Sequence, residues 1–288
     1  MGFTKPIEQI LLSYQGTFIV SKRYYTRGKQ MKKLSIIVPS FNERGNIRPL
    51  VERIDGALKG INHEIFFVDD STDDTPQVIE EVMKECPHVR MKHREGEKGL
   101  ATAVLLGFQL ADGDYLACMD ADLQHPPEIL LPMYVAMQTG ADMVIPSRLI
   151  PGGDDGGLNF IRKFISGTAR VIGQVTLPCL RKISDPTSGL FMFRKEIIAE
   201  ADMRPVGWKI MVEVLATAKF SKVIEIPYTF AERESGESKI DKTATIQYLQ
   251  QCADLRKRYV KDNDITVKRW SQKRMDATVE KFKDKFIK

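Results

Sequence analysis

Two carboxylates separated by one residue, Asp120 and Asp122, are the side chains of this chain best suited to chemistry. They follow an apolar stretch, residues 115–119, that is typical of a buried strand. Side chains alternate along an extended backbone, so both carboxylates would point the same way and would resist ionising together. A hard divalent cation such as Mg²⁺ or Mn²⁺ removes that conflict, because it takes oxygen ligands and bridges to phosphate oxygens. A solvated acidic loop is the alternative. The preceding strand and the following Gln-His-Pro-Pro-Glu sequence favour the metal site.

The elements that must position these carboxylates alternate along the chain from Leu34. Apolar runs predict strands at residues 34–39, 64–68, 89–92, 115–119 and 142–146, and amphipathic segments predict helices at 46–59, 75–85 and 99–110. Small residues in the last of these helices (Ala101, Ala103 and Gly107) would let it approach a sheet closely. The alternation predicts an α/β fold with a mostly parallel sheet covered on both faces. After Ser147 it weakens, with a further strand at 222–227 and helices at 158–177 and 244–259.

Polar clusters follow three of the predicted strands. These clusters are Asn42-Glu43, Asp69-Asp70 and Asp120-Ala121-Asp122. Ligands of such folds bind in the crevice beyond the carboxyl ends of the strands. We therefore expect the three clusters to meet at one site.

Length and composition agree with one globular domain that carries appended tails. The chain has 288 residues, of which 43% are hydrophobic and 28% charged. No uncharged apolar run approaches the roughly 20 residues of a membrane-spanning helix, and no segment resembles a secretory signal. The four cysteines lack the spacing of a zinc site or a disulfide framework, so we expect reduced, cytosolic residues.

The charge is unevenly distributed. Residues 1–33 carry seven Lys/Arg and one acid, and residues 251–288 carry twelve Lys/Arg and six acids, so each end has a charge of +6 and residues 34–250 have −7. Basic ends on an acidic body indicate contact with an anionic surface, either a membrane or nucleic acid. Nucleic acid is disfavoured, because the tails carry no recognised motif and the body is acidic.

The last segment predicts a basic amphipathic helix. Met275, Val279, Phe282 and Phe286 fall on one helical face, with lysines and arginines away from it. The apolar face either lies in a membrane interface or packs against the body of the protein, and the sequence leaves both open.

At this point residues 34 to about 258 resemble the catalytic domain of family 2 glycosyltransferases, in particular the dolichol- or polyprenyl-phosphate mannosyltransferases. The matching segments, in order, are IIVPSFNE (36–43), FVDDSTDDT (67–75), EKGLATAVLLGF (97–108), MDADLQHPPE (119–128), SR (147–148), RKFIS (162–166), DPTSG (185–189) and FAERESGESK (230–239). The resemblance implies a GT-A fold, a nucleotide-sugar donor, a divalent metal and a polyprenyl phosphate acceptor.

The resemblance also implies roles for individual residues. The donor nucleotide would be contacted by Pro39, Phe41, Glu43, Asp120 and Ala121, and its base and ribose by Val68 and Asp70. The metal would be bound by Asp120, Asp122 and Gln124. The donor diphosphate and the acceptor phosphate would be surrounded by Arg148, Arg162, Ser166, Arg233 and Lys239. We take Asp122, Arg148 and Arg233 as catalytic. Many relatives have an extra residue in the second segment, so it stays open whether Asp69 or Asp70 faces the base. His125 is also left open, and Glu128 is expected to be structural.

The chemistry of these residue types agrees with the resemblance. A cation held by Asp120 and Asp122 would stabilise the charge that develops on a departing diphosphate, and arginines offer forked donors to phosphate. No general base is evident. A phosphate acceptor needs none, because it is already largely ionised at neutral pH. We expect a single displacement with inversion at the anomeric carbon.

The sequence thus predicts three parts: a basic extension over residues 1–33, a GT-A domain over 34–260 and a basic helix over 261–288. The expected activity is metal-dependent transfer of a hexose from a nucleotide sugar to a polyprenyl or dolichyl phosphate at the cytoplasmic membrane face. GDP-mannose is the favoured donor, and UDP-glucose and UDP-N-acetylglucosamine are alternatives. The tails or a separate membrane protein would dock the enzyme. Two rival functions remain: extension of a polysaccharide, and nucleotide binding without catalysis.

Overall fold

One mixed β-sheet organises the part of the chain that the structure describes. The computed structural model describes residues 31–96, 98–157, 160–204, 206–231, 242–259 and 264–287, without the side chains of residues 160–162, 164 and 242–244. The strands are β1 (Leu34–Ser40), β2 (His63–Asp69), β3 (Val89–His93), β4 (Tyr115–Cys118), β5 (Met143–Ser147), β6 (Phe191–Arg194), β7 (Lys222–Pro227) and β8 (Thr266–Arg269). Their order is β3-β2-β1-β4-β6-β5-β7-β8. Only β6 runs antiparallel to its neighbours, so the predicted mostly parallel sheet is confirmed.

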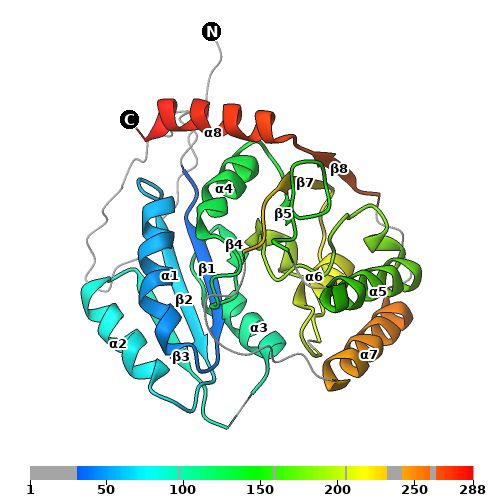
Figure 1. Ribbon diagram of the computed structural model, residues 1–288, viewed down its shortest axis with the longest axis horizontal. Helices are drawn as coiled ribbons and strands as arrows, with labels where there is room; N and C mark the ends of the chain where they lie inside the picture. The colour runs from blue at the N-terminus through cyan, green and yellow to red at the C-terminus, as the bar shows by residue number, and fades with distance from the viewer. Residues whose placement is uncertain are drawn as a thin grey trace, which may run out of the picture. The chain divides into compact units, whose positions relative to one another are not determined.

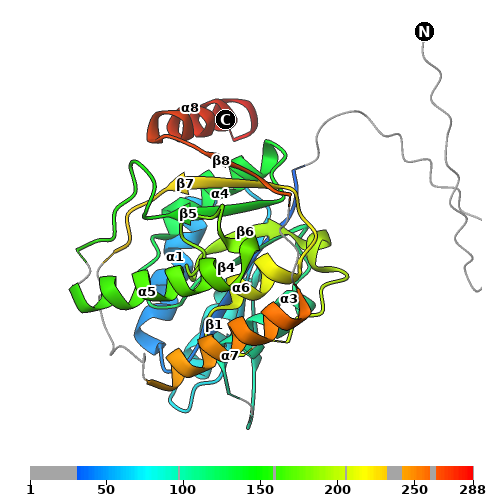
Figure 2. The ribbon, with the colours of Figure 1, turned by 90° about the vertical axis from the view of Figure 1, so that its right-hand side faces the viewer.

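Helices cover both faces of this sheet (Figures 1 and 2). They are α1 (Arg44–Ala57), α2 (Thr75–Glu85), α3 (Leu100–Leu110), α4 (Leu130–Gln138), α5 (Phe160–Thr176), α6 (Ile210–Thr217), α7 (Lys242–Arg258) and α8 (Gln272–Phe286). Helices α1, α4 and α8 lie on one side of the sheet, and α3, α5, α6 and α7 on the other (Figure 2). The strands read as continuous apolar runs because both of their faces are covered.

The small residues of α3 have the role that the sequence indicated. A Cβ at Gly107 would come within 2.4 Å of the Ile37 side chain and 3.3 Å of Val68. Glycine at this position therefore lets α3 lie directly on β1 and β2. This close packing fixes the loop before α3 near the carboxyl end of β2.

The C-terminal segment after the expected boundary at residue 260 contributes a strand and a helix to this fold. Strand β8 extends the sheet by pairing with β7, and α8 begins only at Gln272. The apolar stripe of α8 faces α4, where Phe282 packs against Tyr134 with ring centroids 6.0 Å apart. Met275 and Phe282 are buried. Of the two alternatives for this helix, packing against the body is therefore the one observed.

No helix among the described residues is both long and apolar enough to cross a membrane. The basic N-terminal extension, residues 1–33, lies almost entirely outside the described residues.

Candidate active site

The three polar clusters meet at one edge of the sheet, as the strand pattern predicted. Strand β1 lies between β2 and β4, so residues that follow these three strands are neighbours. Two non-glycine residues there have left-handed backbones, Asn42 with φ of 56° and Leu123 with φ of 60°. Such conformations cost energy and gather at functional sites. Asn42 lies between Phe41 and Glu43, and Leu123 lies between Asp122 and Gln124.

Asp120, Asp122 and Gln124 are placed close together by the turn after β4. Asp122 is 8% exposed, and its Oδ1 accepts a hydrogen bond from the backbone N–H of Gln124 at 3.2 Å. The Asp120 side chain is more open, at 36%. Gln124 is fixed in turn by a backbone hydrogen bond from Ala231 to its carbonyl oxygen, at 2.9 Å.

Space for the Asp120 carboxylate depends on a glycine from a distant part of the chain. A Cβ at Gly189 would come within 2.5 Å of Asp120 Oδ2, so any larger residue would displace the carboxylate. Two carboxylates and an amide oxygen are the hard donor set that Mg²⁺ or Mn²⁺ prefers. The residues present therefore fit a divalent cation held by Asp120, Asp122 and Gln124.

His125 contacts the carboxylate of Asp120. It is buried, its Nε2 lies 3.5 Å from Asp120 Oδ2, and its Nδ1 lies 3.2 Å from the Tyr228 hydroxyl. Its ring also stacks on Tyr228, with centroids 5.9 Å apart. His125, which the sequence left open, is thus a positioning partner of Asp120. Glu128 instead pairs with Arg53 at the surface, as a structural residue would.

A positive cluster lies beside the carboxylates. Arg148 follows β5 and is bound by the buried Asp185, with Nε and Nη2 each 2.8 Å from Oδ2. Lys209, just before α6, donates to the Thr187 carbonyl at 3.0 Å. Burial lowers the pKa of Lys209, and the charges of Asp185, Arg148 and Asp120 also act on it. The Lys209 ammonium therefore lies among the site's charged groups, although no sequence pattern pointed to it.

The donor-side residues are distributed around the ends of β1 and β2. Phe41 is 36% exposed, and the Lys98 ammonium lies 5.6 Å from its ring centroid. Exposed aromatic rings can stack on a nucleobase. Glu43 is half-buried and accepts a hydrogen bond from Asn46 at 2.7 Å. Pro39 is buried within β1, and Ala121 is buried between the two metal-site aspartates.

Asp69 and Asp70, which the sequence could not distinguish as ligand contacts, differ in their exposure in the structure. Asp69 has no exposed surface, and its carboxylate accepts hydrogen bonds from Ser40, Ser71 and His93. Asp70 keeps 8% exposure and is bound by Arg94 at 2.5 Å and by the Gly99 amide at 3.0 Å. Of this pair, Asp70 is therefore the residue that retains surface for a ligand.

The remaining predicted residues lie in β2, in α5 and in the segment after residue 231. Val68 has no exposed surface and packs against Phe66 and Ala103, so the expected contact with a base has no support in this arrangement. Ser166 is half-buried on α5. Arg162 lies in α5 but its side chain is not among those described, and Arg233 and Lys239 lie outside the described residues. Their roles stay predictions.

Comparison with known proteins defines the class of this chain. Residues 35–201 match the family model "Glycosyl transferase family 2". The chain is 44% identical over 226 residues to the dolichol-phosphate mannosyltransferase of Pyrococcus furiosus, covering 78% of this chain and 64% of the relative. It is 36% identical over 234 residues to the dolichol-phosphate mannosyltransferase of Saccharomyces cerevisiae, covering 77% of this chain and 86% of the relative.

The polyprenol monophosphomannose synthase of Mycolicibacterium smegmatis is 34% identical over 215 residues, covering 71% of this chain and 80% of the relative. The chain therefore belongs to glycosyl transferase family 2, and within it the chain is similar to dolichol-phosphate mannosyltransferases. The match spans less than two thirds of the Pyrococcus protein.

Solved structures identify the fold. Glucosyl-3-phosphoglycerate synthase from Mycobacterium tuberculosis matches with a TM-score of 0.56 at 19% identity, over 77% of this chain and 80% of that one. The mannosyltransferase PcManGT from Pyrobaculum calidifontis matches with a TM-score of 0.53 at 18% identity, over 78% and 65%. The expected GT-A fold is thus confirmed.

Proposed function

We propose that this chain transfers mannose from GDP-mannose to a dolichyl or polyprenyl phosphate. The proposal rests on the sequence identity of the chain, over most of its length, to dolichol-phosphate mannosyltransferases and to a polyprenol monophosphomannose synthase. The two solved structures that share its fold include complexes with Mn²⁺, one with UDP-glucose and one with GDP-mannose. The cation of this chain would be Mg²⁺ or Mn²⁺ at Asp120, Asp122 and Gln124, and it would supply Lewis-acid stabilisation of the departing diphosphate.

The chain's own residues would orient both substrates. Phe41 and Asp70 would contact the nucleotide, and Arg148 and Lys209 would place positive charge beside the two phosphate groups. The acceptor phosphate is largely ionised at neutral pH and needs no residue to remove a proton. His125 keeps Asp120 in place rather than acting as a base, because both of its ring nitrogens already face partners. Attack on the anomeric carbon from the far side would invert its configuration.

The acceptor's lipid character has support from the surface around α5. Helices α5 and α7 lie side by side (Figures 1 and 2). Together they expose large apolar side chains, including Ile165, Val171 and Val175 of α5 and Ile246 and Leu249 of α7. Exposed apolar patches of this kind mark lipid or protein contacts. Because α5 also carries Arg162 and Ser166, this surface would bring the phosphate of a membrane-held lipid to the site.

Peripheral docking at the cytoplasmic membrane face would then rest on the α5–α7 surface, with the basic N-terminal extension or a separate membrane protein as further contacts. Helix α8 packs against α4 through the buried Met275 and Phe282, and of its apolar stripe Phe286 is exposed, at 37%, so α8 would contribute little.

A transfer assay tests the function. The full chain is incubated with Mn²⁺, polyprenyl phosphate and, separately, GDP-mannose, UDP-glucose and UDP-N-acetylglucosamine. We expect lipid-linked mannose in the β configuration from the α-linked donor, and none with a free sugar as acceptor. Glu128→Gln, in the same sequence segment but paired with Arg53 at the surface, should retain parent activity, whereas Asp122→Asn should not. Product from a UDP-sugar alone, or with retained configuration, would contradict the proposal.

A further inference from the structure

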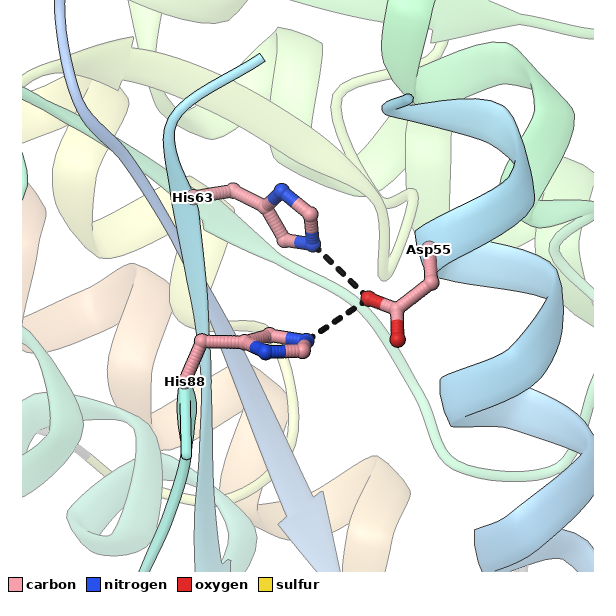
Figure 3. A group of neighbouring side chains, drawn as sticks. All are labelled: Asp55, His63 and His88. Carbon is pink, nitrogen blue, oxygen red and sulfur yellow. Dashed lines mark hydrogen bonds and ion pairs between the residues drawn. The ribbon is translucent and has the colours of Figure 1, made fainter. Parts of the chain in front are cut away.

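Two of the four histidines of the chain converge on one carboxylate oxygen, away from the candidate active site (Figure 3). His63 Nε2 lies 2.9 Å and His88 Nε2 lies 2.7 Å from Asp55 Oδ1. Asp55 is on α1, His63 begins β2, and His88 immediately precedes β3. Since the active site lies beyond the carboxyl ends of the strands, this cluster lies at the opposite end of the sheet.

The two contacts of the His63 ring limit what can join its Nε2 to Asp55. His63 Nδ1 lies 2.9 Å from the Ile61 carbonyl oxygen, which only accepts hydrogen bonds, so Nδ1 carries a proton. A neutral imidazole with a proton on Nδ1 has a bare lone pair on Nε2. That lone pair faces a carboxylate oxygen at 2.9 Å, so two acceptors oppose each other. Either a second proton or a metal cation must lie between them.

A metal cation would accept the Nε2 lone pair of His63 and balance the charge of Asp55 at the same time. Metal-binding histidines typically donate one ring N–H to a backbone carbonyl, which fixes the other nitrogen toward the ion. His63 has this arrangement through Ile61. One oxygen and two nitrogen ligand atoms from Asp55, His63 and His88 all lie within 4.8 Å of one another.

We propose that Asp55, His63 and His88 form a binding site for a divalent transition-metal ion of the zinc class. Two imidazoles and a carboxylate suit Zn²⁺, with a water as the fourth ligand. Ligand atoms around a tetrahedral zinc ion lie about 3.3 Å apart, given bonds of about 2.0–2.1 Å, so the three side chains must separate slightly on binding. His88 and Asp55 can move, because the side chain of each is 33% exposed.

A bound ion would stabilise the fold at the end of the sheet opposite the candidate active site. It joins the last turn of α1, the start of β2 and the turn that leads into β3. An ion that binds the folded chain but not the unfolded one raises the melting temperature by mass action. Magnesium should not substitute, since it prefers oxygen ligands in octahedral geometry.

Zinc titration in the presence of excess Mg²⁺ tests the proposal, because Mg²⁺ occupies oxygen-rich sites such as the one at Asp120 and Asp122. The metal-free full chain competes for Zn²⁺ with a chromophoric chelator. We expect one ion per chain, and at least tenfold weaker binding by His63→Gln and by His88→Gln. His93→Gln is the matched control, since His93 also pairs with an aspartate, Asp69, at 2.8 Å. It should bind Zn²⁺ like the parent, as should Asp122→Asn.

Cobalt provides a second readout that needs no variant. Co²⁺ bound by two imidazoles and a carboxylate at low coordination number gives visible absorption, and Zn²⁺ should abolish it. Failure of the parent chain to take up Zn²⁺, equal affinity in the His63→Gln and parent chains, or a colourless Co²⁺ complex would each overturn the site. Loss of Zn²⁺ binding in Asp122→Asn with His63→Gln unaffected would place the ion at the candidate active site and also overturn it.

Discussion

Arg148 and Asp185 form a buried ion pair in which two nitrogens of one guanidinium meet a single carboxylate oxygen. Both Nε and Nη2 lie 2.8 Å from Asp185 Oδ2, and Asp185 is 1% exposed. The Phe230 ring centroid lies 5.2 Å from Arg148 Cζ. Burial lowers the pKa of Arg148, but the charge and hydrogen bond of Asp185, together with the charges of Tyr228 and Asp155, outweigh burial and the pKa is raised. The guanidinium is therefore both permanently charged and fixed in direction.

This pair predicts that Arg148 depends on its geometry as well as its charge. Arg148→Lys keeps the charge but loses the fork, and Asp185→Asn removes the group that orients it. We expect kcat/KM for the lipid phosphate to fall at least tenfold in each, about 1.4 kcal/mol or more of transition-state binding. Arg53→Lys is the matched control, because Arg53 also donates from Nε and Nη2 to a carboxylate, that of Glu128, but at the surface. Parent-like kinetics of Arg148→Lys would contradict the account.

Gly189 gives a prediction for the metal site that leaves its ligands intact. In Gly189→Ala the new methyl group would lie 2.5 Å from Asp120 Oδ2, and the carboxylate would have to move. We expect a rise of at least tenfold in the Mn²⁺ concentration for half-maximal activity, with little change in melting temperature. Gly56→Ala in α1 is the control, because nothing lies within 4 Å of its added Cβ. An unchanged metal requirement in Gly189→Ala would show that Asp120 does not bind the ion.

The sequence located the crevice because its determinants are local. Side-chain alternation and apolar run length define a strand end, and a parallel sheet brings such ends together, so Asp120 and Asp70 could be placed near each other from their flanking residues alone. The antiparallel β6 and the edge strand β8 were not predicted. Strand β8 has three exposed residues of its four, so it lacks the apolar run that identified the equally short β4.

Residues that reach the site by tertiary packing carried no such signal. Lys209 and Asp185 are far apart in sequence, and only the fold brings both beside Arg148. The alternative for the C-terminal helix could not be resolved either. An apolar stripe is the same whether it meets lipid or, as Phe282 does, the ring of Tyr134.

Glu64 predicts a specific acid dependence of stability. Burial would raise its pKa, but hydrogen bonds from Ser35, the Asp112 amide, Arg90 and Lys33 outweigh burial and lower the pKa from 4.5 to about 2. The folded state thus holds the charged form more tightly than the unfolded state does. This stabilisation is fully present above about pH 4.5 and is lost as the pH falls toward 2. It amounts to at most roughly 3 kcal/mol, at 1.36 kcal/mol per pKa unit.

Urea unfolding between pH 6 and pH 3 measures this dependence. The parent should lose more stability over this range than Glu64→Gln, which has no carboxyl group to protonate. Glu85→Gln removes an exposed carboxylate paired with Arg48 and should follow the parent. If the unfolding free energy of the parent and of Glu64→Gln fell equally with pH, the hydrogen bonds of Glu64 would not be the source of the acid dependence.

The buried position of Phe282 predicts that α8 stabilises the fold rather than the membrane contact. Phe282→Ala removes a side chain that is 7% exposed and should cost about 3 kcal/mol of unfolding free energy. Binding to anionic liposomes should be unaffected. Val175→Asp, on the exposed α5 surface, should instead weaken liposome binding while retaining stability. Reduced liposome binding by Phe282→Ala at a temperature where it is folded would return α8 to the membrane surface.

We infer that the carboxylates of Asp120 and Asp122 hold the cation that stabilises the departing nucleotide. The most direct measurement is the rate of mannosyl transfer from GDP-mannose to polyprenyl phosphate against free Mn²⁺, for the parent and for the Asp120→Ala, Asp122→Ala double variant. We expect a chelator to abolish parent activity and Mn²⁺ to restore it. The double variant should stay at least about a hundredfold slower at every Mn²⁺ concentration. Chelator-resistant transfer, or a double variant that matches the parent, would contradict this inference.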